Sequence, residues 1–264
     1  MPRLPDRFLN CSAFLYPTVD AAMRDVSSGG SGVIMVVRGT INKLVKHYYI
    51  LTNAHVIAGG APSVRITRHD NGQDEFIDKS VGDWVLSDTD DLATCRVESS
   101  DQHGEQRKYL GIYVDMFMDD KDIQKFNVGI GDEVFSIGRF FDADRLPKTT
   151  PVVRFGNIAM MPEKSFPTSR HGKHFEQPSY LVEMRSRTGF SGSPIFAFIS
   201  PTEHRFEVTH WTMADAGRTH GPWFLGLQWG QMPIFGPDIS PEEREVVNPH
   251  FGVRVQWVRF GLIA

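Results

Sequence analysis

The sequence is poor in cysteine, with only Cys11 and Cys95 among its 264 residues. Secreted domains stabilised by disulfides normally carry more, so the sequence predicts a reducing, cytoplasmic environment. Long hydrophobic runs are also lacking: the longest aliphatic run covers residues 33–37, whereas a membrane span needs about 20 apolar residues. The N-terminus carries charges of both signs and is not typical of a secretory signal. We therefore expect no membrane as a partner.

An excess of basic charge is absent as well. Lys and Arg number 28 against 32 Asp and Glu, which gives a formal net charge of −4. A broad nucleic-acid surface needs a net basic field, so we expect no nucleic acid as a partner. Apolar residues make up 41% of the chain and charged residues 23%, as in ordinary globular proteins. The length fits one large domain or two small ones.

Helical periodicity is scarce and is confined to short stretches at residues 19–26 and 241–246. Gly and Pro are frequent, at 24 and 16 residues, which suits many short strands separated by turns. The sequence therefore predicts an all-β, mostly antiparallel fold, either a barrel or a sandwich. Residues 163–178 and 200–222 are polar and contain Pro, so we expect long surface loops there. Runs with strand character cover residues 13–16, 32–38, 48–52, 64–67, 92–97, 133–138, 152–155, 180–184, 193–199, 223–229 and 252–257.

Three segments contain residues suited to catalysis. In the first, Thr52-Asn53-Ala54-His55, a β-branched and aromatic run ends and a His follows on the next turn. In the second, Asp91 opens an alternating strand whose period of two places it on the inward face with Ala93. In the third, Gly189-Phe190-Ser191-Gly192, two glycines permit a tight turn whose backbone N–H groups can point at one spot.

Each segment has a simpler interpretation when taken alone: a core or surface His, a turn Asp, or a Gly/Ser loop. Together they provide what acyl transfer needs, because a hydroxyl nucleophile requires a His base and a carboxylate that fixes the His tautomer. Their order along the chain is His55, Asp91, Ser191.

With these residues the sequence resembles the trypsin-like (chymotrypsin-fold) serine peptidases. Residues 129–138 resemble a loop and strand of the bacterial branch that includes glutamyl-endopeptidase-like and protease-Do-like enzymes, although no PDZ-like domain is expected to follow. The resemblance spans residues 29–257. It implies two antiparallel six-stranded β-barrels with the active site in the cleft between them. The N-terminal barrel, residues 1–125, would carry His55 and Asp91, and the C-terminal barrel, residues 126–264, would carry Ser191.

The resemblance also implies a role for each residue. His55 takes the proton from Ser191 and later gives it to the leaving amine, while Asp91 holds the His ring. The backbone N–H groups of Gly189 and Ser191 form the oxyanion hole. The substrate is a protein or peptide, no cofactor or metal is implied, and the oligomeric state is open. The residues expected to bind substrate are Arg185, Thr188, Gln228, Trp229 and Gly230.

Two positions bear on activation and specificity. Phe190 stands where digestive relatives have an Asp that pairs with a freshly cut N-terminal amine, so activation by that route is not expected. Instead, the Phe190 ring is expected to anchor the turn by packing inward. Arg185 lies six residues before Ser191, at the position that forms the floor of the specificity pocket in the digestive relatives. An Arg there would favour an acidic or polar substrate residue before the scissile bond. The alternative is that Arg185 faces solvent and the pocket takes a small apolar side chain.

The sequence leaves three functions open. The first is an active serine endopeptidase. The second is a catalytically silent trypsin-like fold that acts as a protein-binding module, favoured by the unusual Phe190. The third is an esterase of unrelated fold, which the chain order of the three residues disfavours. A metal site at His171 and His174 is also conceivable, but two His in a polar loop are more often solvated.

Overall fold

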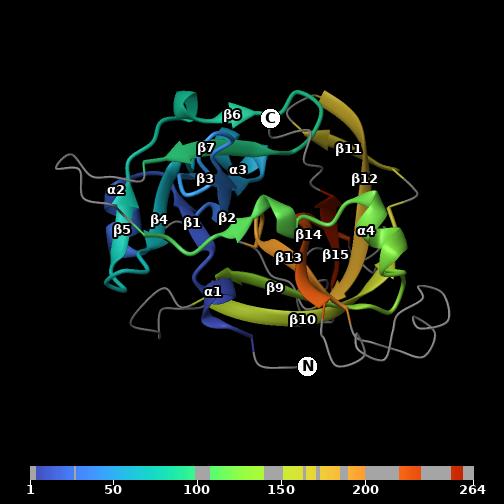
Figure 1. Ribbon diagram of the computed structural model, residues 1–264. Helices are drawn as coiled ribbons and strands as arrows, with labels where there is room; N and C mark the ends of the chain where they lie inside the picture. Colours follow the sequence, from blue (N-terminus) through green and yellow to red (C-terminus); the bar gives the residue numbers. More distant parts are fainter. Residues whose placement is uncertain are drawn as a thin grey trace.

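A computed structural model describes residues 4–26, 28–98, 108–139, 151–162, 165–170, 173–184, 190–199, 220–232 and 251–257. Most of this part of the chain forms two curled sheets, almost entirely antiparallel, that lie next to each other (Figure 1). Strands β1 to β8 build the first sheet, and strands β9 to β15 build the second. The predicted all-β class with two antiparallel sheets is confirmed, although the strand counts differ from six each.

The first sheet has eight strands, in the order β5-β4-β1-β2-β3-β7-β6, and β8 pairs in parallel with β2. No pairing between β5 and β6 closes this sheet in the described residues. The bounds are β1 (Ser12–Tyr16), β2 (Gly30–Arg38), β3 (Lys46–Thr52), β4 (Ser63–Thr67), β5 (Asp74–Ile77), β6 (Val85–Leu86), β7 (Ala93–Val97) and β8 (Ile112–Tyr113).

The second sheet follows the order β10-β9-β13-β14-β15-β12-β11. A further pairing between β10 and β12 joins six of these strands into a closed barrel, with β11 attached to its side. Six of the seven strands of this sheet thus close into a ring. The bounds are β9 (Glu133–Arg139), β10 (Pro151–Met160), β11 (Ser165–Arg170), β12 (Lys173–Met184), β13 (Pro194–Ile199), β14 (His220–Met232) and β15 (Phe251–Trp257).

The helices are short. In α2 the side chain of Thr18 caps the first turn by accepting a hydrogen bond from the Ala21 backbone N–H. No helix in the described part of the chain is long and apolar enough to span a bilayer. The helices are α1 (Asp6–Leu9), α2 (Val19–Arg24), α3 (Ala54–Ala58) and α4 (Asp120–Lys125), with 3-10 turns η1 (Val81–Asp83) and η2 (Val114–Met116).

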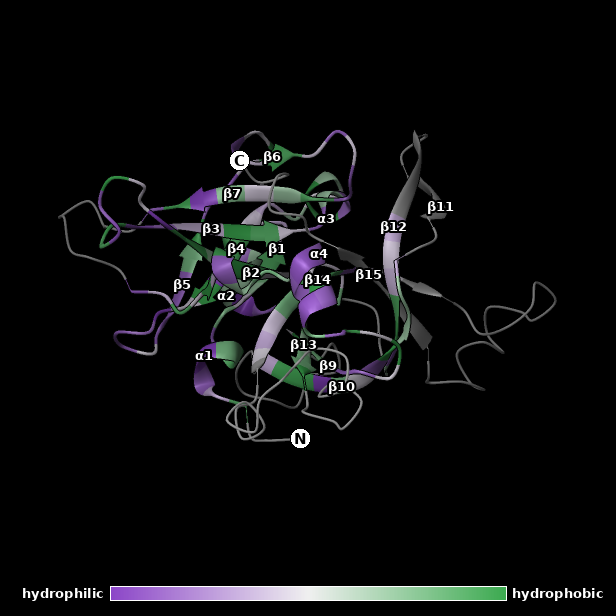
Figure 2. Cartoon of the chain, turned by 45° about the vertical axis from the view of Figure 1, so that its right-hand side comes forward, coloured by the Kyte–Doolittle hydropathy of each residue, from purple (hydrophilic) through white to green (hydrophobic). Residues whose placement is uncertain are grey.

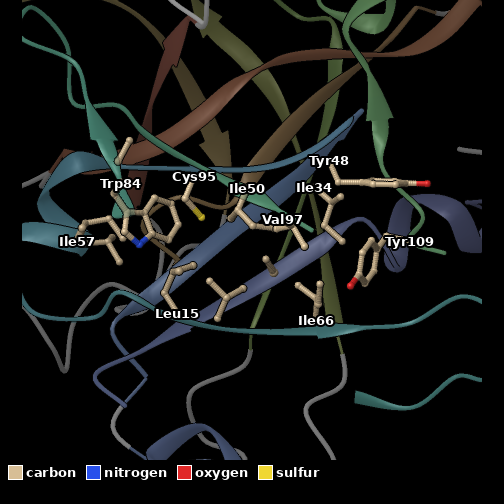
Figure 3. Packing of buried hydrophobic residues seen from close by; sticks show 14 of the residues in the cluster. Leu15, Ile34, Tyr48, Ile50, Ile57, Ile66, Trp84, Cys95, Val97 and Tyr109 are labelled. Atoms are coloured by element: carbon tan, nitrogen blue, oxygen red, sulfur yellow. The ribbon is translucent and has the colours of Figure 1, made fainter. Parts of the chain in front are cut away.

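Buried side chains of the described residues form four clusters: one inside each sheet, a third between the two sheets, and a smaller fourth where helix α2 packs against β1. Figure 3 shows the first cluster, in which Trp84 packs beside Ile50 and Cys95. In the cluster between the sheets, Met35 of β2 belongs with residues of β9, β13 and β14. The α1 residue Phe8 joins this cluster, with its ring centroid 5.3 Å from that of Phe196. Figure 2 shows the matching hydropathy pattern, with apolar residues along the central strands and hydrophilic residues on helix α4.

All the runs with strand character proved to be strands, and α2 confirms the helix expected within residues 19–26. The loop expected at residues 163–178 was wrong, because β11 and β12 pair there as an antiparallel hairpin from Ser165↔Pro178 to Arg170↔Lys173. Backbone pairing tolerates polar side chains, and β11 is an edge strand, where Pro is allowed. The helix expected at residues 241–246 lies outside the described residues, as does most of the 200–222 stretch.

Candidate active site

His55 is held by a single carboxylate at two points. Strand β3 ends at Thr52, and His55 occupies the first turn of helix α3. The His55 backbone N–H donates to Asp91 Oδ1 at 2.9 Å, and its ring Nδ1 lies 2.7 Å from Asp91 Oδ2. An acceptor facing Nδ1 favours the tautomer with hydrogen on Nδ1, which leaves Nε2 able to accept a proton.

Asp91 is buried and firmly placed. Its side chain is 3% exposed, whereas that of His55 is 24% exposed. The Asp91 backbone carbonyl accepts hydrogen bonds from the Ala54 N–H and from Asn53 Nδ2, both at 3.1 Å. Strand β7 alternates after it, with buried residues at the positions that share its face. The His55 ring faces Asp91, whereas the neighbouring Asp90 accepts a hydrogen bond from Thr89 Oγ1.

The turn that carries Ser191 is fixed to the second sheet through its backbone. The Ser193 N–H donates to the Phe190 carbonyl at 2.9 Å, which closes the turn. The Gly192 N–H donates to Gln228 O at 2.8 Å, and the Gln228 N–H donates to Ser193 O at 2.9 Å. Gly192 has φ +82°, and a Cβ there would lie 1.9 Å from the Ser31 carbonyl oxygen. Only glycine fits this position without moving β2.

The first sheet contacts the same turn. The Ser31 N–H donates to the Ser191 carbonyl at 2.8 Å, and Thr52 Oγ1 donates to the Ser31 carbonyl at 2.6 Å. A Cβ on Gly30 would lie 2.9 Å from both Ser191 O and a methyl group of Val56, the residue that follows His55. The Ser191 backbone therefore lies beside the helix that carries His55. Sequence reasoning missed Gly30 and Ser31, for which the sequence offers no local signal.

Burial distinguishes the two serines of the turn. Ser193 is fully buried and its Oγ has no hydrogen-bond partner among the described residues. Ser191 is partly exposed. A nucleophile must reach a substrate carbonyl, so exposure favours Ser191.

The structure describes only some of the residues expected to bind substrate. Gln228 and Trp229 lie in β14 and are each 2% exposed, while Gly230 is half-buried. The Trp229 indole N–H donates to Ser179 Oγ at 3.1 Å. The roles of these three residues stay predictions. Arg185, Thr188 and the oxyanion-hole residue Gly189 lie outside the described residues.

The described residues contain no group of three or more His, Cys, Asp or Glu placed to hold a metal ion. His171 lies outside the described part of the chain, and the side chain of His174 is not described. The two thiols are ordinary core groups: Cys11 and Cys95 are free and buried, and burial raises the pKa of each to about 12.

Comparison with known proteins finds similarity in three-dimensional structure. No protein-family model matches the chain, and no curated protein matches its sequence. A mutant of tobacco etch virus protease superposes with a TM-score of 0.49 and 10% identity, over 100% of this chain and 80% of that one. The active form of the Rv3671c protease from M. tuberculosis gives 0.48 and 13%, over 100% and 89%. Catalytically inactive tobacco etch virus protease complexed with substrate gives 0.48 and 11%, over 99% and 84%. Identities this low transfer no residue role.

Proposed function

We propose that the chain is a serine endopeptidase that hydrolyses peptide bonds through an acyl-enzyme. One observation carries the proposal: a buried Asp91 carboxylate binds both the backbone N–H and the ring Nδ1 of His55. This pair lies in the same part of the molecule as the turn that presents the partly exposed Ser191. A nucleophile, an oriented base and an orienting carboxylate are the three groups that acyl transfer needs.

In the proposed reaction Ser191 Oγ attacks the carbonyl carbon of the scissile bond, and its proton passes to His55 Nε2. Asp91 stays ionised and accepts the Nδ1–H bond, which stabilises the imidazolium that forms. The carbonyl oxygen becomes an oxyanion that accepts hydrogen bonds from the Gly189 and Ser191 backbone N–H groups. The C–N bond then breaks, and the leaving amine takes the proton from His55. Water hydrolyses the resulting ester by the same steps.

The division into two barrels near residue 125 is part of the proposal. It is supported by the sheets, because β8 ends the first sheet at Tyr113 and β9 begins the second at Glu133. The active site would then draw His55 and Asp91 from residues 1–125 and Ser191 from residues 126–264. The reducing, cytoplasmic location inferred from the two cysteines also stays a prediction.

A fluorophosphonate probe tests the function, because it forms an O–P bond only with an activated serine and releases fluoride. We expect the native chain to be labelled and to hydrolyse peptides. The Ser191→Ala variant should be neither labelled nor active. A native chain that is neither labelled nor active would overturn the proposal and favour the protein-binding module.

Profiling with a diverse peptide library then tests specificity. If Arg185 forms the floor of the pocket, cleavage follows acidic or polar residues, because a guanidinium donates charge-assisted hydrogen bonds to them. Cleavage mainly after Lys or Arg would contradict this assignment and leave the triad untouched.

A further inference from the structure

The Phe190 ring precedes the proposed nucleophile directly and is enclosed on two sides. It is 1% exposed, as expected for a ring that anchors the turn by packing inward. On one side it lies against Gly138 of β9, where a Cβ would come within 2.7 Å of two ring carbons. On another, the guanidinium carbon of Arg154 lies 4.2 Å from the ring centroid. The ring therefore contacts both a glycine of β9 and the guanidinium of Arg154.

Strand pairing brings Arg154 to this ring. Arg154 lies in β10 opposite Ser136 of β9, and Ser136 lies opposite Ile195 of β13. Strand β13 begins at Pro194, three residues after Ser191. Three neighbouring strands, β10, β9 and β13, therefore connect Arg154 with the turn that carries Ser191. A guanidinium attracts an aromatic face electrostatically and stacks on it as a flat group.

We propose that Arg154 is a positioning residue, which holds the Phe190 ring against Gly138 and so fixes the turn that presents Ser191. The proposal rests on the function proposed above. Arg154 acts through Phe190, whose carbonyl accepts the Ser193 N–H that closes the turn. When the ring tilts, the peptide bond to Ser191 rotates with it and the direction of Oγ changes. Such small misplacements of a reacting group slow the chemical step more than they weaken substrate binding.

The first experiment compares Arg154→Met, Arg154→Lys and Arg96→Met in peptide hydrolysis and fluorophosphonate labelling. Arg96 lies in β7 with an exposed side chain and is the matched control. We expect Arg154→Met to lower kcat and the labelling rate about tenfold, with KM changed less than about twofold. Arg154→Lys keeps the cation but not the flat group and should recover part of kcat. Arg96→Met should match the native chain. An unchanged kcat in Arg154→Met would overturn the proposal.

The second experiment does not depend on activity. Hydrogen exchange is measured for the peptide that contains residues 190–193 and for peptides from β2 and β3. We expect Arg154→Met to speed exchange in the turn and to leave β2 and β3 unchanged. Unchanged exchange in the turn, or faster exchange in both sheets together with a lower melting temperature, would overturn the positioning role. If the native chain is not labelled by fluorophosphonate, the proposed function fails, and the exchange result still decides whether Arg154 holds the turn.

Discussion

The two halves of the candidate site are held in place by different forces. In the first sheet, His55 is fixed by hydrogen bonds to one buried carboxylate, at its backbone N–H and at its ring. In the second sheet, the Ser191 turn is fixed by backbone hydrogen bonds, by a glycine at positive φ and by the packing of Phe190. A base must be held in one tautomer, which needs an acceptor, whereas a nucleophile must be aimed, which needs a fixed backbone.

We therefore expect substitutions in the two halves to affect activity and stability differently. Loss of the carboxylate removes the acceptor that faces Nδ1 and selects the His55 tautomer, while the fold remains. Loss of the Phe190 ring leaves a cavity under the turn, so stability and activity fall together. Asp91 variants should therefore separate activity from melting temperature, whereas Phe190 variants should lower both.

The largest effect is expected from Ser191→Ala, which removes the nucleophile of the proposed reaction. By analogy with well-studied triad proteases, turnover should fall by about 10⁶. The melting temperature should stay close to that of the native chain, because a partly exposed hydroxyl contributes little to the core. Peptide turnover and calorimetry measure the two quantities. A variant that keeps native turnover would show that another residue is the nucleophile.

Asp91→Asn tests the first half of the comparison. An amide at this position can donate to Nδ1 and so favours the wrong His55 tautomer, and we expect kcat to fall by about 10⁴. The matched control is Asp90→Asn. Its carboxylate accepts from Thr89 Oγ1 and its backbone N–H donates to Ser87 Oγ, whereas the His55 ring faces Asp91. Its kcat should stay near the native value. Equal losses in the two variants would mean that the loop, and not the carboxylate, orients the His.

How much of this site could be read from the sequence depends on the range of the interaction. Alternation along β7 placed Asp91 on the buried face, since the period of two is a local property. The contact between Arg154 and Phe190 joins residues in different strands, and its origin is the pairing of β10, β9 and β13. No local pattern specifies which arginine lies over which ring, so this contact needed the structure.

The fold shows the same division. Strands rich in β-branched and aromatic residues were predicted, because such side chains fit a half-buried sheet. The sequence did not predict β5, β6, β8 and β11. Of these, β6 and β8 are two residues long, and β5 opens with two acidic residues. Their pairing is set by neighbouring strands and by backbone hydrogen bonds, to which composition gives no guide.

Phe190→Ala tests the second half of the comparison. Removing a fully buried ring should cost about 3–5 kcal/mol of stability and lower activity at the same time. The matched control is Phe155→Ala in β10, whose side chain is 44% exposed and which should melt much closer to the native chain. Melting temperature and peptide turnover are measured for both. A Phe190→Ala variant that keeps its melting temperature and its turnover would remove the anchoring role of the ring.

The last prediction does not involve activity and concerns the two buried thiols, which lie in different parts of the fold. Cys11 lies in the cluster between the sheets, and Cys95 lies in the core of the first sheet. Burial is the main cause that raises the pKa of each thiol to about 12, above the ordinary 9.0. The folded state therefore retains protons that the unfolded state loses. The thiols' contribution to stability is complete below pH 9.0 and is lost as the pH rises towards 12.

Alkylation with iodoacetamide measures how readily each thiol becomes accessible, and so compares the stability of the two regions. At pH 8 the native chain should react slowly at both cysteines, because the thiolate is the reactive form and both groups are buried. With increasing denaturant, Cys11 should be labelled before Cys95 if the contact between the sheets opens before the first sheet does. Mass spectrometry of the two peptides gives the order, and unfolding followed from pH 8 to pH 11 checks the loss of stability. Simultaneous labelling would mean that both sheets unfold as one unit, so that the two halves of the site, although held by different forces, share one stability.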